Sequence, residues 1–382
     1  MGEKMSRLKI LFISHTFMGG TFVVGSHHLS RELSLKGHYV VHMSTPITLL
    51  HLLNAKDEEQ RQRIKVAFNK TSISETNVIN YIPISFIPWK ISRILYNITG
   101  VNFLTKTILD TKKILKQDFD YVIIDQPKCV GLEEKLRAKK IIYRATDLYA
   151  SLINDNVIVK AESKIISVSE GMIGTSTPVV KHLKAISDKP VLQLENGVEA
   201  EHFQKKCSVP KEYASIEGPI AVYVGALDHR FDFDALKWIS DGFPNLNIMI
   251  IGPSDINIKK SFSQSNNVNF LGPKKYSDLP PYLQFATIGL LLLSNHPSNN
   301  GRSPMKLYEY ASSGLPVVAK ATEQIEKVKS SFIYKYKSMD ELSSCVEEVL
   351  GTEINKKDII DSAKEHSWAH KTNRLLEFLT NL

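Results

Sequence analysis

Cysteine is scarce in this chain of 382 residues, which contains only three. Cys129, Cys207 and Cys345 lie far apart in the sequence, and their spacing matches neither a disulfide framework nor a zinc site. Such residues are typical of reduced thiols in the cytoplasm, and we assign them no chemistry.

Long apolar runs are missing as well. No run reaches the roughly 18 residues that a membrane-spanning helix needs, and the opening MGEKMSRLK lacks the apolar stretch of a signal peptide. The composition, 43% hydrophobic and 23% charged, is that of an ordinary globular protein. We therefore expect a cytoplasmic protein whose length leaves room for two domains.

Strong nucleotide and metal motifs are also absent. The chain has no GxxxxGKS/T sequence, and the turn at Gly19 and Gly20 lacks the full GxGxxG spacing. These absences argue against a phosphate-binding-loop ATPase and leave only weak support for a dinucleotide site. The Asp-x-Asp string at Asp232 lies at a predicted helix start, where it is typical of a helix cap. We expect no metal and no other cofactor.

The net charge of +8 is unevenly distributed along the chain. Residues 1–205 contain 28 Lys and Arg against 20 Asp and Glu, whereas the remainder contains 20 of each, so the whole excess lies in the first part. Such an excess suits nucleic acid or an anionic membrane surface. No RNA-binding aromatic motif or zinc-finger spacing is present, so we expect no nucleic acid partner.

Residues 86–117 favour the membrane. The stretch mixes aromatic side chains with six Lys or Arg and a single acid, Asp110, a pattern typical of helices that lie in a membrane interface. An amphipathic helix packed on its own domain is an equally good interpretation. On the membrane interpretation the protein is peripheral, on the inner face. The residues expected on the membrane or acceptor side are Trp89, Lys90, Arg93, Lys112 and Lys113.

Short apolar strands alternate with helical stretches along the chain, which predicts an α/β fold of parallel sheets covered by helices. Two such series are separated by a predicted linker near residues 205–217, so we expect two Rossmann-like, doubly wound domains facing across a cleft. The first is residues 1–205 and the second 206–362, with a final helix, 363–382, packed back on the first. The expected strands are 8–14, 39–43, 120–125, 140–143, 164–168 and 191–194 in the first domain, and 219–224, 246–251, 268–271 and 288–293 in the second.

The most informative segment follows the last of these strands. It contains a helix start, with Ser303 as the expected N-cap and Pro304 at the first helical position. A helix start at the carboxyl edge of a sheet attracts anions. Lys306 in the first turn suits a diphosphate, and Glu309, three residues later on the same face, suits two ribose hydroxyls. An ordinary surface Lys–Glu pair is the alternative interpretation.

Several longer pieces of the sequence resemble glycosyltransferases of the two-Rossmann-domain (GT-B) type, and most of all the membrane-associated glucuronosyltransferase of xanthan assembly and its relatives. The pieces span nearly the whole chain, and YRATD is the most specific to the xanthan-type branch. They are ILFISH at 10–15, YRATDLYASLIND at 143–155, VSEGM at 168–172, ENGVEAEHF at 195–203, YVGALDHRFDFDAL at 223–236, IIGPS at 250–254 and MKLYEYASSGLPVV at 305–318.

The resemblance implies a hexosyltransferase that uses a UDP-sugar, with UDP-glucuronate as one candidate, and a lipid-linked or oligosaccharide acceptor in polysaccharide biosynthesis. The second domain would bind the donor, with Lys306 at the diphosphate and Glu309 at the ribose. The other donor residues that the resemblance implies are Met305 and Gly225 near the diphosphate, Gly272 and Lys274 near the base, and Gly19, Gly20 and His15 at the sugar end.

The resemblance also implies that Asp147, in YRATD, is the general base, and the chemistry supports the same residue. Inverting transfer needs one base for the acceptor hydroxyl and positive charge for the leaving diphosphate. Asp147 follows a predicted buried strand, and Lys306, Arg302 and the helix start can replace a metal ion. A helix N-cap is the alternative role for Asp147. The remaining candidates for the base are His15, His27 and His28.

Three other functions stay open. Many retaining GT-B enzymes carry a second Glu eight residues before the ribose Glu, where this chain has Gly301, which disfavours retention without excluding it. A nucleotide-sugar epimerase has the same two-domain fold but needs no acceptor. A non-catalytic scaffold has no need of Asp147, Lys306 and Glu309 together.

Overall fold

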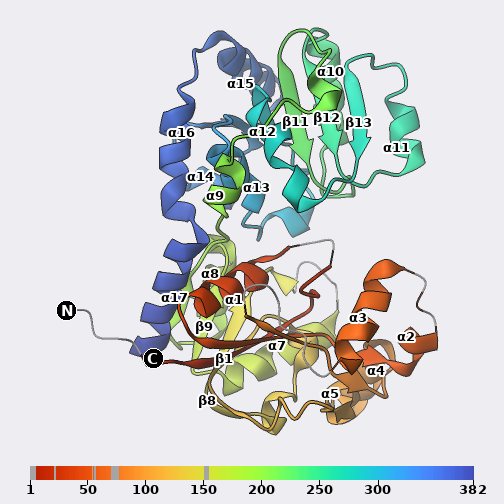
Figure 1. Ribbon diagram of the computed structural model, residues 1–382, viewed down its shortest axis with the longest axis vertical. Helices are drawn as coiled ribbons and strands as arrows, with labels where there is room; N and C mark the ends of the chain where they lie inside the picture. Colours follow the sequence, from red (N-terminus) through yellow and green to blue (C-terminus); the bar gives the residue numbers. More distant parts are fainter. Residues whose placement is uncertain (1–5, 21–22, 54, 56, 70–76, 150–154) are drawn as a thin grey trace. The chain divides into compact units, whose positions relative to one another are not determined.

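The structure, a computed structural model, describes residues 6–20, 23–53, 55, 57–69, 77–149 and 155–382 (Figure 1). It divides into two compact units: unit 1 contains the residues up to Glu195 together with Lys371–Leu382, and unit 2 is Asn196–His370. The division therefore falls after Glu195 and not after residue 205, and the chain returns to unit 1 at Lys371 and not at residue 363.

The predicted linker near residues 205–217 is wrong for a physical reason. Val198, Phe203 and Tyr213 are all buried in the core of unit 2, so the whole stretch after Glu195 is part of that unit. It contains the short helix α9 (Ala200–Gln204) and the 3-10 turn η3 (Lys211–Tyr213).

Unit 1 is built on a parallel sheet of seven strands in the order β10-β9-β8-β7-β1-β2-β4. Strand order reverses between β1 and β7, so the switch point of the sheet lies between these two strands. Side chains on both faces of β1 are buried, as a parallel sheet covered on both faces requires. The strands are β1 (Lys9–Ser14), β2 (Tyr39–Ser44), β4 (Ile79–Tyr81), β7 (Asp118–Ile124), β8 (Arg137–Ala145), β9 (Gly171–Gly174) and β10 (Val191–Gln193).

Unit 1 contains an insertion between β2 and β7. It holds a small sheet, β3 (Ile47–Thr48), β5 (Ile84–Ser85) and β6 (Ile108–Leu109), with its own apolar cluster around Phe17 and Ile82. The helices and 3-10 turns are α1 (Gly25–Leu35), α2 (Leu49–Leu53), α3 (Glu58–Phe68), α4 (Trp89–Thr99), α5 (Phe103–Lys106), η1 (Pro127–Cys129), η2 (Glu133–Lys135), α7 (Asn156–Val168) and α8 (Thr177–Ile186).

The predicted strand at residues 164–168 is wrong, because these residues end helix α7. Its buried residues Val157, Ile158, Ala161 and Ile165 recur at helical spacing, and Asp155 caps its start by accepting a hydrogen bond from the N–H of Val157. The strand at this place in the sheet is β9, which starts at Gly171.

Unit 2 is a parallel sheet of six strands in the order β13-β12-β11-β14-β15-β16, which is the Rossmann order 3-2-1-4-5-6. Alternate residues of β11 lie in two different apolar cores, so both faces of the sheet are covered. The strands are β11 (Ile220–Val224), β12 (Asn247–Ile251), β13 (Val268–Gly272), β14 (Ile288–Leu291), β15 (Val317–Lys320) and β16 (Ile333–Tyr336).

The final helical stretch is divided. Helix α16 ends at Ala363, the 3-10 turn η6 follows, and α17 begins at Trp368, because Ser367 forms a bridge with Val198 and interrupts the helix. The other helices and turns of unit 2 are α10 (Phe233–Gly242), α11 (Ile256–Ser261), η4 (Tyr276–Asp278), α12 (Pro280–Gln284), η5 (Pro297–Asn299), α13 (Met305–Ser312), α14 (Glu323–Glu326), α15 (Met339–Gly351) and α16 (Lys356–Ala363), with η6 (Lys364–His366) and α17 (Trp368–Asn381) completing the chain.

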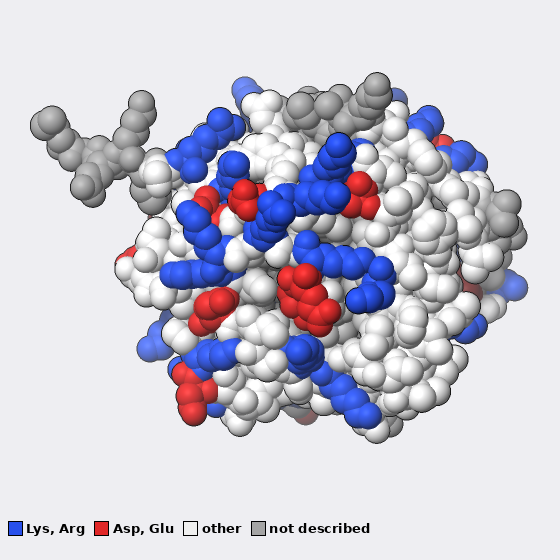
Figure 2. All heavy atoms as spheres, turned by 90° about the horizontal axis from the view of Figure 1, so that it is seen from below, with Lys and Arg blue, Asp and Glu red and all other residues white. Residues whose placement is uncertain are grey.

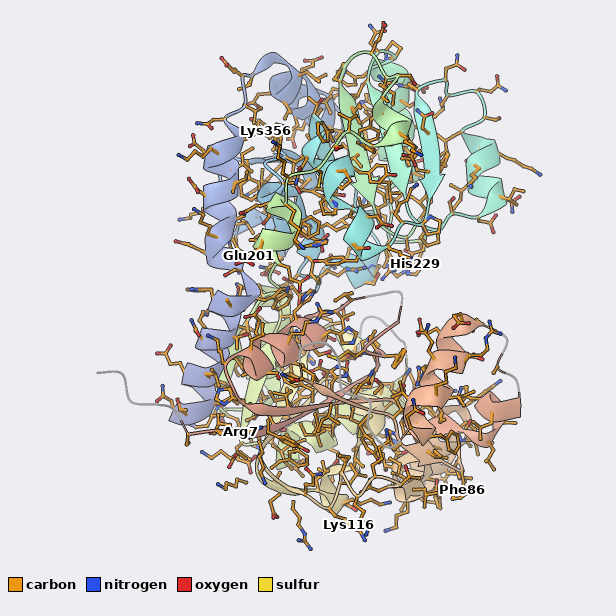
Figure 3. All side chains as sticks on the ribbon, in the orientation of Figure 1. Arg7, Phe86, Lys116, Glu201, His229 and Lys356 are labelled. Atoms are coloured by element: carbon orange, nitrogen blue, oxygen red, sulfur yellow. The ribbon has the colours of Figure 1, made fainter. Side chains whose placement is uncertain are left out.

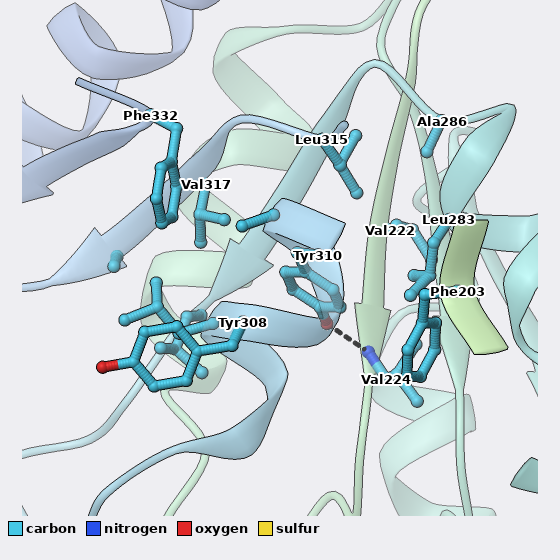
Figure 4. Close-up of a cluster of buried hydrophobic side chains, with 14 of the residues drawn as sticks. Phe203, Val222, Val224, Leu283, Ala286, Tyr308, Tyr310, Leu315, Val317 and Phe332 are labelled. Carbon is cyan, nitrogen blue, oxygen red and sulfur yellow. Dashed lines mark hydrogen bonds between the residues drawn. The ribbon is translucent and has the colours of Figure 1, made fainter. Parts of the chain in front are cut away.

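Tyr310 fixes helix α13 on the sheet at its switch point. Strand β14 pairs with β11 only as far as Val222, and beyond that point the backbone N–H of Val224 donates a hydrogen bond of 2.9 Å to Tyr310 Oη (Figure 4). Gly289 makes room for the ring, since a Cβ there would lie 2.4 Å from Tyr310 Cδ2. The position of α13 therefore depends on a fully buried aromatic side chain.

Candidate active site

Three glycines lie at the carboxyl edge of the unit 2 sheet. Gly225 follows β11, Gly252 follows β12, and Gly272 ends β13. The N–H of Gly225 donates to the carbonyl of Ile251 (2.8 Å), and the N–H of Gly252 donates to the carbonyl of Gly272 (3.0 Å). A Cβ on Gly252 would lie 1.8 Å from the carbonyl oxygen of Gly225, so this turn requires glycine. The lack of side chains suits close approach of a phosphate to the backbone.

Helix α13 starts beside these glycines in a different way from the one predicted. Its N-cap is Pro304, and Met305 is the first helical residue, so the prediction of Ser303 as the cap is wrong. Ser303 Oγ instead accepts a hydrogen bond from the N–H of Asn196 (3.0 Å), and Asn196 Nδ2 donates to the carbonyl of Ser303 (2.9 Å). This contact with a residue distant in sequence holds the loop that leads into α13.

Lys306 and Glu309 lie in the first turns of α13. Desolvation lowers the pKa of Lys306, while the charge of Glu309 raises it. Burial raises the pKa of Glu309 to about 7, while Lys306 lowers it and Glu199 raises it further. Lys306 also approaches Gly225, since a Cβ there would lie 2.9 Å from Lys306 Cε. Unit 2 therefore brings Lys306 close to Gly225 and within electrostatic reach of Glu309.

Two further charged residues in this neighbourhood were not predicted from the sequence. Arg230 Nε donates to Asp228 Oδ1 (2.8 Å), and the charges of both residues, like that of Arg302, act on Lys306. The carbonyl of Arg230 accepts from the N–H of Ser294 and from Asn299 Nδ2, both at 2.9 Å, which ties the loop after β11 to the loop before α13. Asp228 and Arg230 are part of the motif YVGALDHR, and this motif is the feature of the sequence from which they could have been predicted. Figure 3 labels His229, which lies between them in the sequence.

Lys274 already has a carboxylate partner. Its Nζ lies 2.6 Å from Glu212 Oε1, and Tyr282 Oη donates to the same carboxylate at 2.9 Å. The hydrogen bond with Glu212 raises the pKa of Lys274. Whatever Lys274 binds has to compete with this ion pair.

Asp147 lies just past strand β8, at the carboxyl edge of the unit 1 sheet. It is partly buried, and Thr146 Oγ1 lies 3.5 Å from its Oδ2. Near the ends of strands β7 and β8, Arg144 Nη1 and Asp125 Oδ2 form an ion pair of 2.9 Å in which both side chains are 2% exposed. The alternative role of Asp147 as a helix cap concerns a stretch of which residues 150–154 lie outside the described residues.

His15, Gly19 and Gly20 lie on the loop after β1, next to the switch point of unit 1. Desolvation, followed by the charges of Lys128 and Arg144, lowers the pKa of His15, which favours the neutral ring. Gly19 has a φ of +118°, which favours glycine, and the N–H of Gly20 closes the turn on the carbonyl of Phe17 (3.1 Å).

His27 and His28 are both buried in α1, which makes them poorer candidates for a base that must reach a substrate. Burial lowers the pKa of His27 to about 4. Within the described parts of the chain, no group of three or more His, Cys, Asp or Glu side chains is arranged to hold a metal ion.

The residues expected on the membrane side lie on and after helix α4. Arg93 pairs with Asp155 (2.8 Å), and Lys112 Nζ donates to the carbonyl of Val66 (2.7 Å), so both are engaged within unit 1. Trp89 is partly buried, whereas Lys90 and Lys113 are exposed. No helix among the residues described is both long and apolar enough to cross a membrane.

The face of α4 that carries isoleucines is not packed on its own unit. Ile91, Ile94 and Ile98 are 49%, 58% and 76% exposed. Phe86, which precedes the helix and is labelled in Figure 3, is 53% exposed. Ser92 is the residue of α4 that is fully buried. Figure 2 shows Lys and Arg gathered on one part of the unit 1 surface, beside a broad uncharged area on the side where α4 and α5 lie in Figure 1.

Comparisons with known proteins show what the chain is similar to in sequence and fold. Residues 233–377 match a protein family described as glycosyl transferase-like. The Bacillus subtilis (strain 168) protein named "Putative teichuronic acid biosynthesis glycosyltransferase TuaH" is 28% identical over 235 residues, which cover 56% of this chain and 59% of TuaH. The chain thus matches little more than half the length of this relative.

Two solved structures share the fold over nearly the whole chain. Sucrose-phosphate synthase from Thermosynechococcus elongatus has a TM-score of 0.71 and 14% identity, with 98% of each chain covered. Anabaena HepE in complex with UDP-glucose has a TM-score of 0.69 and 14% identity, covering 98% of this chain and 100% of HepE. The chain has the fold of the GT-B type, two Rossmann-like α/β domains with parallel sheets, and its sequence is similar to proteins described as glycosyltransferases.

Proposed function

We propose that this protein transfers a sugar from a nucleoside diphosphate donor to an acceptor hydroxyl, with inversion at the anomeric carbon and without a metal ion. The observation that carries the proposal is the pair Lys306 and Glu309 at the start of α13, beside Gly225 at the switch point of a Rossmann sheet. Ligands bind at such switch points in open α/β sheets. The cation suits the diphosphate and the carboxylate suits the ribose.

The donor that we propose is a UDP-sugar. HepE, which shares the fold, is described with UDP-glucose bound, and TuaH is named for teichuronic acid biosynthesis. The resemblance to the xanthan-type branch makes UDP-glucuronate one candidate. Of the cations that could bind its carboxylate, Lys274 and Arg144 already pair with Glu212 and Asp125, which disfavours these two.

In the proposed reaction Asp147 is the general base. Its carboxylate takes the proton of the acceptor hydroxyl while the hydroxyl oxygen forms a bond to the anomeric carbon. The bond from that carbon to the diphosphate oxygen breaks, and the nucleoside diphosphate leaves with its charge stabilised by Lys306, Arg302 and the start of α13. The new glycosidic bond lies on the face opposite the leaving group, so the configuration is inverted.

The acceptor that we propose is a lipid-linked or polysaccharide acceptor at the inner face of a membrane. The exposed isoleucines of α4 support this, because an apolar stripe beside basic residues is suited to an anionic interface. Lys90 and Lys113 are exposed and would face the lipid headgroups.

The test is a donor panel followed by product analysis. Thermal shift with uridine, guanosine and thymidine diphosphate sugars should show stabilisation by a UDP-sugar, and the shift should be lost in Lys306→Ala. Turnover should require a lipid-linked oligosaccharide and give an inverted anomeric centre. Conversion of the donor without any acceptor would identify an epimerase, and a retained configuration would identify a retaining transferase.

A further inference from the structure

The buried ion pair of Asp125 and Arg144 lies at the ends of two neighbouring strands, β7 and β8. A buried ion pair costs desolvation, and replacing one with apolar residues is often neutral for stability. The presence of the Asp125–Arg144 pair, with Arg144 on the strand that leads to Asp147, therefore suggests a role other than stability. Burial raises the pKa of Asp125 to about 6, while the charge of Arg144 lowers it, so the arginine favours the ionised carboxylate.

Tyr149 connects the backbone of Asp125, whose side chain pairs with Arg144, to the turn that carries Asp147. Its hydroxyl donates to the backbone carbonyl of Asp125 at 2.9 Å, and Thr146 Oγ1 lies 2.9 Å from the same hydroxyl. Because the single proton of Tyr149 is used on Asp125, Thr146 is the donor in the second bond. Tyr149 is 6% exposed, so water cannot readily replace either partner.

The turn is also held from its other side. Thr175 Oγ1 donates to the carbonyl of Thr146 at 2.9 Å, and the N–H of Thr175 donates to the carbonyl of Ala145 at 3.2 Å. Asp147 thus follows Thr146, whose backbone carbonyl and side chain both form hydrogen bonds. Two residues after Asp147, the hydroxyl of Tyr149 is hydrogen-bonded as well. Burial and then the charge of Asp147 raise the pKa of Tyr149, which keeps its hydroxyl protonated as a donor.

We propose that Tyr149 and Thr146, supported by Asp125 and Arg144, are positioning residues that hold the turn carrying Asp147 and so keep its carboxylate in the reactive orientation. This inference rests on the proposed function, in which Asp147 is the general base. A displacement of about 1 Å at a reacting group can cost on the order of 10²-fold in rate, so loss of these bonds should reduce turnover without removing any reacting group.

The test compares two tyrosines of unit 1. Tyr149→Phe removes the bonds to Asp125 and Thr146. Tyr143→Phe is a matched control, because Tyr143 is also buried and its hydroxyl donates to Glu162 at 2.7 Å, and not to Asp125 or Thr146. Both variants should lose thermal stability. Only Tyr149→Phe should lose kcat, by about 10- to 100-fold, with the donor KM within twofold of the parent.

A double variant separates positioning from general loosening of the fold. Thr146→Val should lower kcat in the same way. The double variant Thr146→Val with Tyr149→Phe should have a kcat no lower than that of the less active single variant, because both substitutions remove the bond between Thr146 and Tyr149. Fully additive losses, or a Tyr149→Phe enzyme with parental kcat while Asp147→Asn is inactive, would overturn the positioning role and leave the base in place. An active Asp147→Asn enzyme would overturn both proposals.

Discussion

Lys306 and Glu309 carry opposite charges one turn apart on helix α13. Desolvation lowers the pKa of Lys306 and raises that of Glu309, so it favours the neutral form of each side chain. Each residue partly offsets the shift of the other. A bound diphosphate would favour the charged ammonium of Lys306. Donor binding should therefore be coupled to the ionisation of the Lys306 and Glu309 side chains.

Replacing Lys306 with Ala should remove positive charge from the leaving diphosphate. The expected loss in transition-state stabilisation is about 2–4 kcal/mol, measured as kcat/KM for the donor. Lys337→Ala is a suitable control, since Lys337 is an exposed lysine of unit 2 that pairs with Glu326. Parental turnover by Lys306→Ala would show that the donor site is misplaced.

Glu309 should make donor binding depend on pH. Its pKa is raised to about 7, so the carboxyl is largely protonated below that pH and ionised above it. Ribose hydroxyls donate better to a carboxylate, so the donor KM should fall as pH rises from 6 to 8 and then level off. Glu309→Gln should raise the donor KM and remove this pH dependence. A pH-dependent KM that persists in Glu309→Gln would assign the effect to another group.

The same shift has a consequence for stability. The pKa of Glu309 is raised above its unfolded value, so ionisation costs stability, and the cost grows as pH rises from about 4.5 to about 7. Glu309→Gln should therefore gain stability over the parent at pH 8, compared with pH 4, in urea titrations without donor. An equal difference at the two pH values would contradict the raised pKa.

Asp147→Asn tests the base directly. The amide keeps the shape and, since Asn caps helices about as well as Asp, any capping role, but it cannot accept the hydroxyl proton. We expect kcat to fall by about 10²–10⁴-fold with donor binding intact in calorimetry. Asp155→Asn is the control, because Asp155 caps α7 and pairs with Arg93. If Asp147→Asn stays active, His15 is the next candidate.

The isoleucine stripe of α4 should determine membrane binding. Ile91→Ser, Ile94→Ser and Ile98→Ser together should abolish cosedimentation with vesicles containing anionic lipid, and binding of the parent should weaken as salt rises. Leu35→Ser with Ile186→Ser is the control, since both residues are exposed in unit 1 away from α4. Equal binding to neutral vesicles at every salt concentration would argue against the electrostatic part of the proposal.

Gly289→Ala should be destabilising because the new Cβ would lie 2.4 Å from the ring of Tyr310. The ring and helix α13 would have to shift, at a cost of about 1–3 kcal/mol in the free energy of unfolding. Gly351→Ala, with open space around its Cβ position at the end of α15, should be neutral or stabilising by up to about 1 kcal/mol. Similar unfolding midpoints for the two variants would contradict this account of how α13 is held.

Two predicted elements differ from the structure because their local sequence pattern is ambiguous. Ile165, Ile166 and Val168 favour a strand, but Ile165 lies on the buried helix face that also contains Val157 and Ala161. The final helix was expected to be continuous, and a bridge from Val198 to Ser367 divides it. A short apolar run is compatible with either element, so distant contacts decide between them.

The sequence by itself determined the α/β class, most strands of both sheets, the positions of Gly225 and Asp147 just after strands, and that of Lys306 in the first turn of a helix. The periodicity of apolar residues and the presence of turn residues depend only on residues close together in the sequence, so these features can be predicted from local sequence. Only the tertiary structure decided the burial of Glu309 and the pairing of Asp125 with Arg144. Partners in such contacts lie on different strands and loops, and their desolvation depends on the packed fold, which no local pattern contains.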